Sequence, residues 1–343
     1  MAVRIRGKRE LLAKVMLRSG AYSLATRLPP RNSLLVLNYH RIGNRAATAF
    51  DPGVVSATAQ EFDDQISWMK RRLSLVTLEE AIAFIGGSIK EQKACCRLLI
   101  TFDDGYLDNY QIAYPILRSH GVQGVFFLVT GFVGTSHIPW WDHIAYLLKT
   151  GRRRRFSLHF PAELTIDINK NGLTESLRSV LNLYKRPDNS APARFIRDLT
   201  IATEGDDPPE TLRRFLNWDE AREMIRGGMA IGSHTHSHNV LGQLDPTQQF
   251  DELTTSRAIL GEKLGISADV LAYPVGSITS FSDQTKKIAR EVGYRAAFSF
   301  HGGKNLKKRV APFDIKRSEL ASPNCDRFRV QVSMSRLTGG LWP

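Results

Sequence analysis

Short runs of apolar residues recur along the chain in the manner of buried strands. They predict strands over residues 34–39, 98–102, 125–129, 230–233, 270–273 and 296–300. Most of these runs are followed by a segment with helical spacing of apolar residues, and several such segments end just before a glycine. The predicted helices cover residues 59–70, 78–85, 110–120, 218–226, 247–264 and 283–292. Because strands and helices alternate, we expect an α/β domain with a mainly parallel sheet, either open or closed into a barrel.

The alternation fails in one region, residues 152–217. Charged residues, scattered apolar positions and a loop signal at residues 205–209 leave no succession of strands there. We therefore predict a partly helical insertion over 152–217 inside a domain of residues 31–325. Residues 1–30 are predicted to form a basic amphipathic segment, and residues 326–343 a C-terminal tail.

Composition narrows the class of protein. The 343 residues are 42% hydrophobic and 24% charged, and no apolar run is long enough to span a bilayer. Lys14 and Arg18 interrupt the apolar part of the N-terminus, and three cysteines, two of them adjacent, do not suggest a disulfide framework. We therefore expect a cytoplasmic protein. The net charge of +13 allows peripheral contact with the inner membrane surface, whereas the absence of a nucleic-acid motif argues against nucleic acid as a partner.

Two adjacent carboxylates follow the apolar run 98–102. Asp103 and Asp104 precede Gly105, so both acids are expected at the C-terminal tip of a strand, where α/β folds place their active sites. The alternative is an ordinary Asp-Gly turn in which an aspartate caps the next helix.

Three histidines follow a second strand, at positions 234, 236 and 238. In an extended chain His234 and His238 would lie about 13 Å apart at roughly 3.3 Å per residue, which is too far for one ion. A metal site therefore requires the chain to turn here. With Asp104 these two histidines would form a set of three protein ligands that leaves a position for water, as in catalytic zinc sites.

These segments together resemble a known family. TFDDG at residues 101–105 and HTxxH at 234–238 are similar to the first two motifs of the polysaccharide deacetylase family, carbohydrate esterase family 4. YPVG at 273–276 resembles the third motif region, and WWD at 140–142 resembles a segment common in members from exopolysaccharide gene clusters. The resemblance implies a distorted (β/α)7 barrel and a hydrolase that removes acetyl groups from an N-acetylated oligosaccharide, polysaccharide or lipid-linked precursor.

The resemblance also implies roles for individual residues. Asp104, His234 and His238 would hold a divalent metal ion, with zinc foremost and cobalt, manganese or nickel as alternatives. Asp103 would be the general base, and the backbone N–H of Tyr106 would help to bind the oxyanion. Hydrolysis of an amide needs a polarised carbonyl, a base that takes the proton of the attacking water and a donor for the oxyanion, and these groups would supply all three.

The sequence departs from the family pattern at two points. The arginine that orients the base in relatives is replaced by Ala272, and we consider Arg317 as its substitute. The C-terminal Leu-x-His motif that supplies the general acid is not found. His40 follows the strand at 34–39 and resembles the acid of a circularly permuted branch that includes poly-N-acetylglucosamine deacetylases. Since the first and last strands of a closed barrel are neighbours, we predict His40 as the acid, with His301 as the second choice.

Aromatic residues offer a binding surface for a sugar. Trp140, Trp141 and Tyr273 could stack on sugar faces or could simply pack in the core. Two other functions remain open from the sequence: hydrolysis of a small non-sugar amide, and non-catalytic binding of carbohydrate. The missing arginine at Ala272 favours the non-catalytic alternative, whereas the complete set of acids and histidines argues against it.

Overall fold

A computed structural model of the chain describes residues 30–87, 95–186, 188–209, 214–306, 311–318 and 325–338, together with positions 15 and 28. Apart from positions 15, 28 and 30, the predicted amphipathic segment of residues 1–30 lies outside the described residues, so membrane contact stays a prediction. In the part of the chain that is described, no helix has the length and apolar character needed to cross a membrane.

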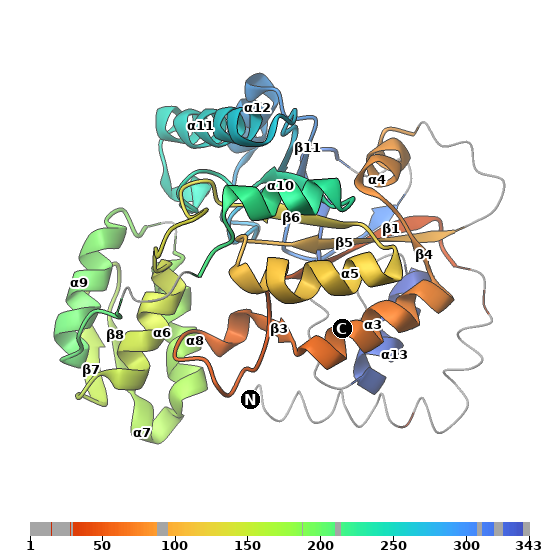
Figure 1. Ribbon diagram of the computed structural model, residues 1–343. Coiled ribbons are helices and arrows are strands. Elements are labelled where there is room, and N and C mark those ends of the chain that lie inside the picture. Colours follow the sequence, from red (N-terminus) through yellow and green to blue (C-terminus); the bar gives the residue numbers. More distant parts are fainter. Residues whose placement is uncertain are drawn as a thin grey trace.

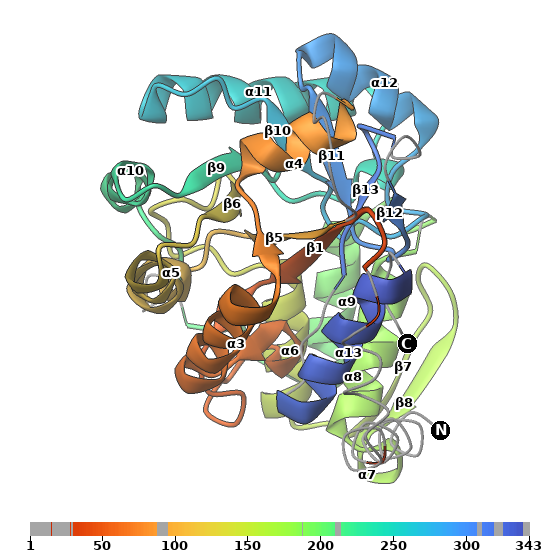
Figure 2. The ribbon, with the colours of Figure 1, turned by 90° about the vertical axis from the view of Figure 1, so that its right-hand side faces the viewer.

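A nine-stranded sheet forms the centre of the molecule (Figures 1 and 2). In spatial order its strands are β12 (Asn305–Leu306), β1 (Ser33–Tyr39), β5 (Cys96–Phe102), β6 (Gly124–Leu128), β9 (Ala230–Ser233), β10 (Val270–Ala272), β11 (Ala296–Ser299) and β13 (Ile315–Lys316), with β4 (Ser74–Leu75) beside β5. Only β12 runs antiparallel to its neighbour among these described strands. The six strands predicted from the sequence are confirmed. A small separate ladder pairs β2 (Arg41–Ile42) with β3 (Val55–Ala57).

The sheet closes on itself next to β1. Ser318, two residues after β13, forms a parallel bridge with Leu37 of β1. The N–H of Ser318 donates to the carbonyl of Val36 at 3.0 Å, and the N–H of Asn38 donates to the carbonyl of Ser318 at 3.1 Å. The parallel strands β1, β5, β6, β9, β10, β11 and β13 therefore form the expected distorted (β/α)7 barrel, and its first and last strands are neighbours.

Helices surround the barrel, and all six that the sequence predicts are confirmed. They are α3 (Ala59–Arg72), α4 (Leu78–Ile85), α5 (Tyr114–His120), α10 (Trp218–Arg226), α11 (Pro246–Leu264) and α12 (Asp283–Val292). The turn η2 (Asn109–Ala113) leads into α5, and η1 (Pro52–Val54) and η3 (Leu241–Gln243) are single turns. Capping boxes begin several helices, as at Thr58 with Glu61. Helix α13 (Cys325–Thr338), in the predicted C-terminal tail, packs on α3, where Phe328 meets Trp68 with ring centroids 6.0 Å apart.

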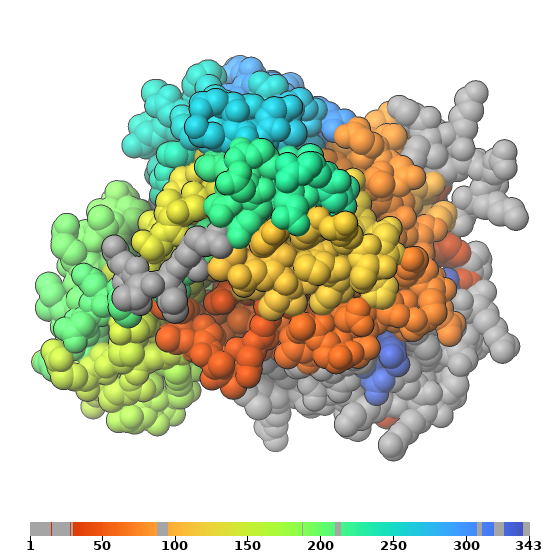
Figure 3. Space-filling view, in the orientation of Figure 1, coloured from red at the N-terminus to blue at the C-terminus, as the bar shows by residue number. Residues whose placement is uncertain are grey.

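A lobe stands beside the barrel, at the left of Figures 1 and 3. It contains α6 (Trp140–Thr150), β7 (Arg155–Leu158), β8 (Leu164–Asp167), α7 (Ile168–Asn171), α8 (Leu173–Tyr184) and α9 (Pro192–Thr203). These elements share a hydrophobic cluster of their own, in which Leu148 of α6 and Phe195 of α9 are fully buried. The lobe corresponds to the predicted insertion, but its core begins with α6, before residue 152. We call it the α6–α9 lobe.

Candidate active site

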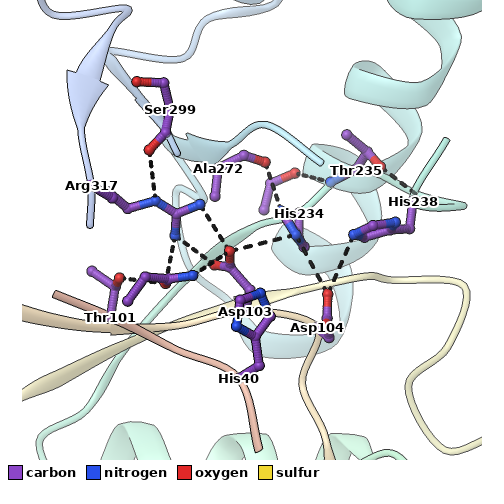
Figure 4. Close-up of polar contacts among 12 residues, drawn as sticks. His40, Thr101, Asp103, Asp104, His234, Thr235, His238, Ala272, Ser299 and Arg317 are labelled. Carbon is purple, nitrogen blue, oxygen red and sulfur yellow. Dashed lines mark hydrogen bonds and ion pairs between the residues drawn. The ribbon is translucent and has the colours of Figure 1, made fainter. Parts of the chain in front are cut away.

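The C-terminal ends of three barrel strands bring the predicted catalytic residues together (Figure 4). His40 follows β1, Asp103 and Asp104 follow β5, and His234 follows β9. Backbone bonds extend the strand pairing to these residues: the N–H of Asp103 donates to the carbonyl of Tyr39 at 3.0 Å, and the N–H of His234 to that of Leu128 at 2.8 Å. All four side chains line one cleft of about 430 Å³, a size usual for ligand sites.

Asp104, His234 and His238 form a set of converging ligand atoms. Oδ1 of Asp104 lies 3.5 Å from Nε2 of His234 and 3.4 Å from Nε2 of His238, and no hydrogen-bond donor satisfies this buried oxygen. Burial, and then the negative charges of Asp103 and Asp142, raise the pKa of Asp104 well above its ordinary value. A cation between these atoms would relieve that cost. One carboxylate and two imidazoles are a usual donor set for a divalent metal ion, so the residues present fit the predicted metal.

The chain turns sharply between the two histidines, as a shared ion requires. Thr235 and His238 adopt left-handed backbone conformations, with φ of 67° and 57°, which is unusual for a β-branched residue such as threonine. The turn brings the rings of His234 and His238 to 4.8 Å between centroids. It is held by the Oγ1 of Thr235, which accepts from the N–H of His238 at 3.1 Å, and by Glu252 of α11, whose carboxylate accepts from the N–H groups of residues 236 and 237.

The other ring nitrogen of His234 also has a defined partner. Its Nδ1 lies 2.7 Å from the carbonyl oxygen of Ala272, which orients the ring and leaves Nε2 toward Asp104. The third histidine of the cluster, His236, lies 3.0 Å from Oγ1 of Thr130 through its Nδ1 and is not part of the converging set.

Asp103 forms a buried, bidentate ion pair with Arg317. The two guanidinium nitrogens donate to its carboxylate oxygens at 2.6 and 2.8 Å, and Asn38 donates to Oδ2 at 2.9 Å. Arg317 is fully buried, and it also donates to the carbonyl of Ser299. Burial alone would raise the pKa of Asp103, but the charge and hydrogen bonds of Arg317, together with the charges of His234 and His40, outweigh burial and hold that pKa below its ordinary value. Arg317 therefore makes the contact with Asp103 that an arginine at position 272 was expected to make. The contact from Asn38 was not indicated by the sequence.

The two candidates for the general acid have different surroundings. His40 lines the cleft, and its backbone is fixed by bonds to Ser56 and Asn109. Burial, followed by the charge of Arg317, lowers the pKa of His40 to about 4 although Asp103 opposes the shift. The ring of His301 instead pairs with Asp314 at 3.0 Å, and His301 does not line the cleft.

The three predicted substrate-binding residues lie in different environments. Trp141 borders the cleft, with its ring 4.5 Å from that of His238, and its indole N–H donates to the hydroxyl of Tyr106 at 2.7 Å. The side chain of Tyr106 is itself buried, which leaves its backbone as the predicted contact. Tyr273 is fully buried, stacks on Phe281 and donates its hydroxyl to a backbone carbonyl. The structure therefore contradicts a sugar-stacking role for Tyr273, because its ring belongs to the core.

Relatives with similar sequences are named as polysaccharide deacetylases. Among curated proteins, YxkH of Bacillus subtilis (strain 168) is 22% identical over 271 residues, which cover 79% of this chain and 65% of YxkH. The poly-β-1,6-N-acetyl-D-glucosamine N-deacetylase of Staphylococcus epidermidis is 30% identical over 117 residues, which cover 31% of this chain and 39% of that protein. The matched region thus spans less than two thirds of each relative's length.

Solved structures share the fold. The deacetylase PplD of Streptococcus pyogenes, in complex with acetate, superposes with a TM-score of 0.54 at 18% identity, covering 90% of this chain and 99% of PplD. IcaB of Ammonifex degensii gives 0.53 at 21% identity, covering 89% of this chain and 97% of IcaB. The sequence model described as polysaccharide deacetylase matches residues 90–297. Since that match covers more than half of the 343 residues of the chain, the chain belongs to the polysaccharide deacetylase family.

Proposed function

We propose that the protein is a metal-dependent deacetylase that hydrolyses the acetamide of N-acetylated sugars in an oligosaccharide, polysaccharide or lipid-linked precursor, with release of acetate. The observation that carries the proposal is that two arrangements lie next to each other in one cleft. One is Asp103 held ionised by Arg317, and the other is the converging set of Asp104, His234 and His238. The name of the staphylococcal relative supports an N-acetylglucosamine polymer as the class of substrate.

Asp103 is suited to take a proton from the attacking water. A divalent metal held by the three ligands would polarise the acetamide carbonyl and make a bound water more acidic. A carboxylate offers about four acceptor positions, and Arg317 and Asn38 occupy one on Oδ1 and two on Oδ2. Oδ1 of Asp103 therefore keeps the capacity to accept a further proton donor.

The backbone N–H of Tyr106 is suited to the oxyanion. Tyr106 forms an isolated antiparallel bridge with Phe215, in which the bonds are made by the neighbouring residues, from Leu107 to the carbonyl of Arg214 and from Leu216 to that of Gly105. In such a pair the amide of the central residue points away from the partner. The N–H of Tyr106 is therefore not used by the bridge and can donate to the charge that develops on the carbonyl oxygen.

His40 remains our candidate for protonating the departing sugar amine. Its ring lies in the same cleft as Asp103. Since the lowered pKa of His40 disfavours a resting imidazolium, the ring would have to receive its proton during the reaction, and the proton that Asp103 takes from the water would have to be passed on to it.

The alternative of a non-catalytic carbohydrate-binding protein rested on the missing arginine at Ala272. Arg317 makes the contact with the base that this arginine was expected to make, so that argument no longer holds.

The decisive experiment measures acetate released by the zinc- or cobalt-loaded protein from N-acetylglucosamine oligomers. The matched control is Asp103→Asn, which should retain the metal while kcat falls by about 10² to 10⁴, the usual contribution of a general base. Turnover of small cyclic amides without acetate from any sugar would establish the amidase alternative, and no turnover of either would establish the non-catalytic one.

A further inference from the structure

One wall of the cleft comes from the α6–α9 lobe and not from the barrel. Helix α6 contributes Trp140 and Trp141, and α8 with the residue after it contributes Leu181 and Lys185. Trp140 stacks on Tyr184 of α8 with ring centroids 4.2 Å apart, so the two helices present these side chains as one surface.

Contacts through two indole rings connect Lys185 with one of the predicted metal ligands. The ring of His238 contacts that of Trp141 at 4.5 Å, and Trp141 contacts Trp140 edge-on at 5.1 Å. The Lys185 ammonium lies 5.7 Å from the centroid of Trp140. Lys185 lines the same cleft, and its charge adds to burial in lowering the pKa of His40, so a group bound at Lys185 would lie beside the acetamide at the ligand set.

Asp51 faces the same part of the cleft with the opposite charge. Its backbone N–H donates to Oδ1 of Asp142 at 3.1 Å, and its own carboxylate accepts from the N–H of Gly53 at 2.7 Å, so the residue is anchored on both sides. Burial lowers the pKa of Lys185 and raises that of Asp51, while the charge of each group opposes the shift of the other and so favours its ionised form. Within the described residues, however, no direct ion pair joins the two, and Lys185 has no ion-pair partner.

A carboxylate and an ammonium that share a cleft without touching match the hydroxyl groups of a sugar. A hydroxyl donates to the acid and accepts from the ammonium, while the C–H face of a pyranose packs on apolar side chains such as Trp140 and Leu181. A negatively charged ligand is less well matched. Lys185 is balanced by Asp51, and Arg178, the other cation of this wall, pairs with Glu175 at 2.5 Å.

We propose that Asp51 and Lys185 form a subsite for a neutral pyranose that adjoins the deacetylated sugar, so that the α6–α9 lobe makes the enzyme selective for oligomers. This inference rests on the proposed deacetylase function. The net positive charge of the chain then takes no part in binding the glycan within the cleft.

The test compares substrates of different length. The ratio of kcat/KM for a trimer over the monomer of N-acetylglucosamine is measured by acetate release, with β-1,4- and β-1,6-linked oligomers, for Lys185→Met and Asp51→Asn. Loss of a hydrogen bond to a charged group costs about 1.5–3 kcal/mol, so this ratio should fall roughly 10- to 100-fold. Lys170→Met, an exposed lysine of the same lobe, should keep the ratio of the unmodified protein.

A second measurement does not depend on turnover. Binding of the trimer to Asp103→Asn, followed by tryptophan fluorescence, should weaken by a similar factor when Lys185→Met is added, and circular dichroism checks that each variant is folded. Equal losses on monomer and trimer, or losses confined to glycans that carry a carboxylate or phosphate, would overturn the subsite. Acetate release from no sugar by the unmodified protein would instead overturn the proposed function on which it rests.

Discussion

Arg317→Met tests whether the base is held by a buried ion pair. Arg317 is fully buried, and its two donors meet the two oxygens of Asp103, whose side chain is only 3% exposed. Removing one partner of a buried pair leaves the other charge without compensation and typically costs about 3–5 kcal/mol. We therefore expect the free energy of unfolding of the metal-free protein to fall by about that amount, measured by urea denaturation with tryptophan fluorescence.

An exposed pair in the same chain provides the control. Arg153 and Glu204 also form an arginine–carboxylate pair, but their side chains are 54% and 44% exposed, so Arg153→Met should cost less than about 1 kcal/mol. Asp103→Asn combined with Arg317→Met removes both buried charges and should recover part of the lost stability. Arg317→Lys keeps the charge but not the two parallel bonds, and should lose activity as well as stability. Losses of equal size below 1 kcal/mol for Arg317→Met and Arg153→Met would refute this reasoning.

Three further predictions concern the site and its support. The double variant His234→Ala, His238→Ala should no longer retain stoichiometric metal by elemental analysis, because it keeps one donor of three; full retention would place the ion elsewhere. His40→Ala should reduce kcat on acetamides far more than on activated acetate esters, whose leaving groups need little protonation, and equal losses would indicate a structural role. Burial raises the pKa of Asp142 to about 6, so its stabilising contribution is complete below about pH 4 and is lost as the pH rises through 6. As the pH rises from about 4 to 6, the unfolding free energy of Asp142→Asn should therefore increase by about 2–3 kcal/mol relative to that of the unmodified protein. If the difference between the two proteins stays constant across this range, the expectation is wrong.

The elements that the sequence predicted well are those with long or strongly patterned segments. Six barrel strands and six helices around them were predicted, as were the ends of β5 and β9 that carry the predicted metal ligands. Strand β13 was missed because two residues are too short for any periodicity to be seen. The elements of the α6–α9 lobe were missed for another reason. They bury their apolar residues against one another and contain no strand of the barrel, so the alternation of buried strand and helix does not extend through them.

The side chains that the sequence could not reveal are those brought in by loops. Asp51 precedes a single helical turn and Lys185 ends a helix, both positions at which charged residues are ordinary on a protein surface. Only the packing of α6 against α8 and the anchoring of Asp51 by Asp142 place them in the cleft. Their separation along the chain carries no signal of this proximity.

Closure of the barrel explains why the base can be held by a residue far from the third motif. Strand β1 lies between β5, which carries Asp103, and the segment at Ser318 that closes the sheet. Arg317 therefore reaches across β1, bonds to Asn38 on the way, and meets Asp103. Around a closed ring of parallel strands, several neighbours can deliver a side chain to the same point of the rim, whatever their order along the chain. An arginine at position 272 is consequently not needed to hold Asp103, and the carbonyl oxygen of Ala272 orients His234.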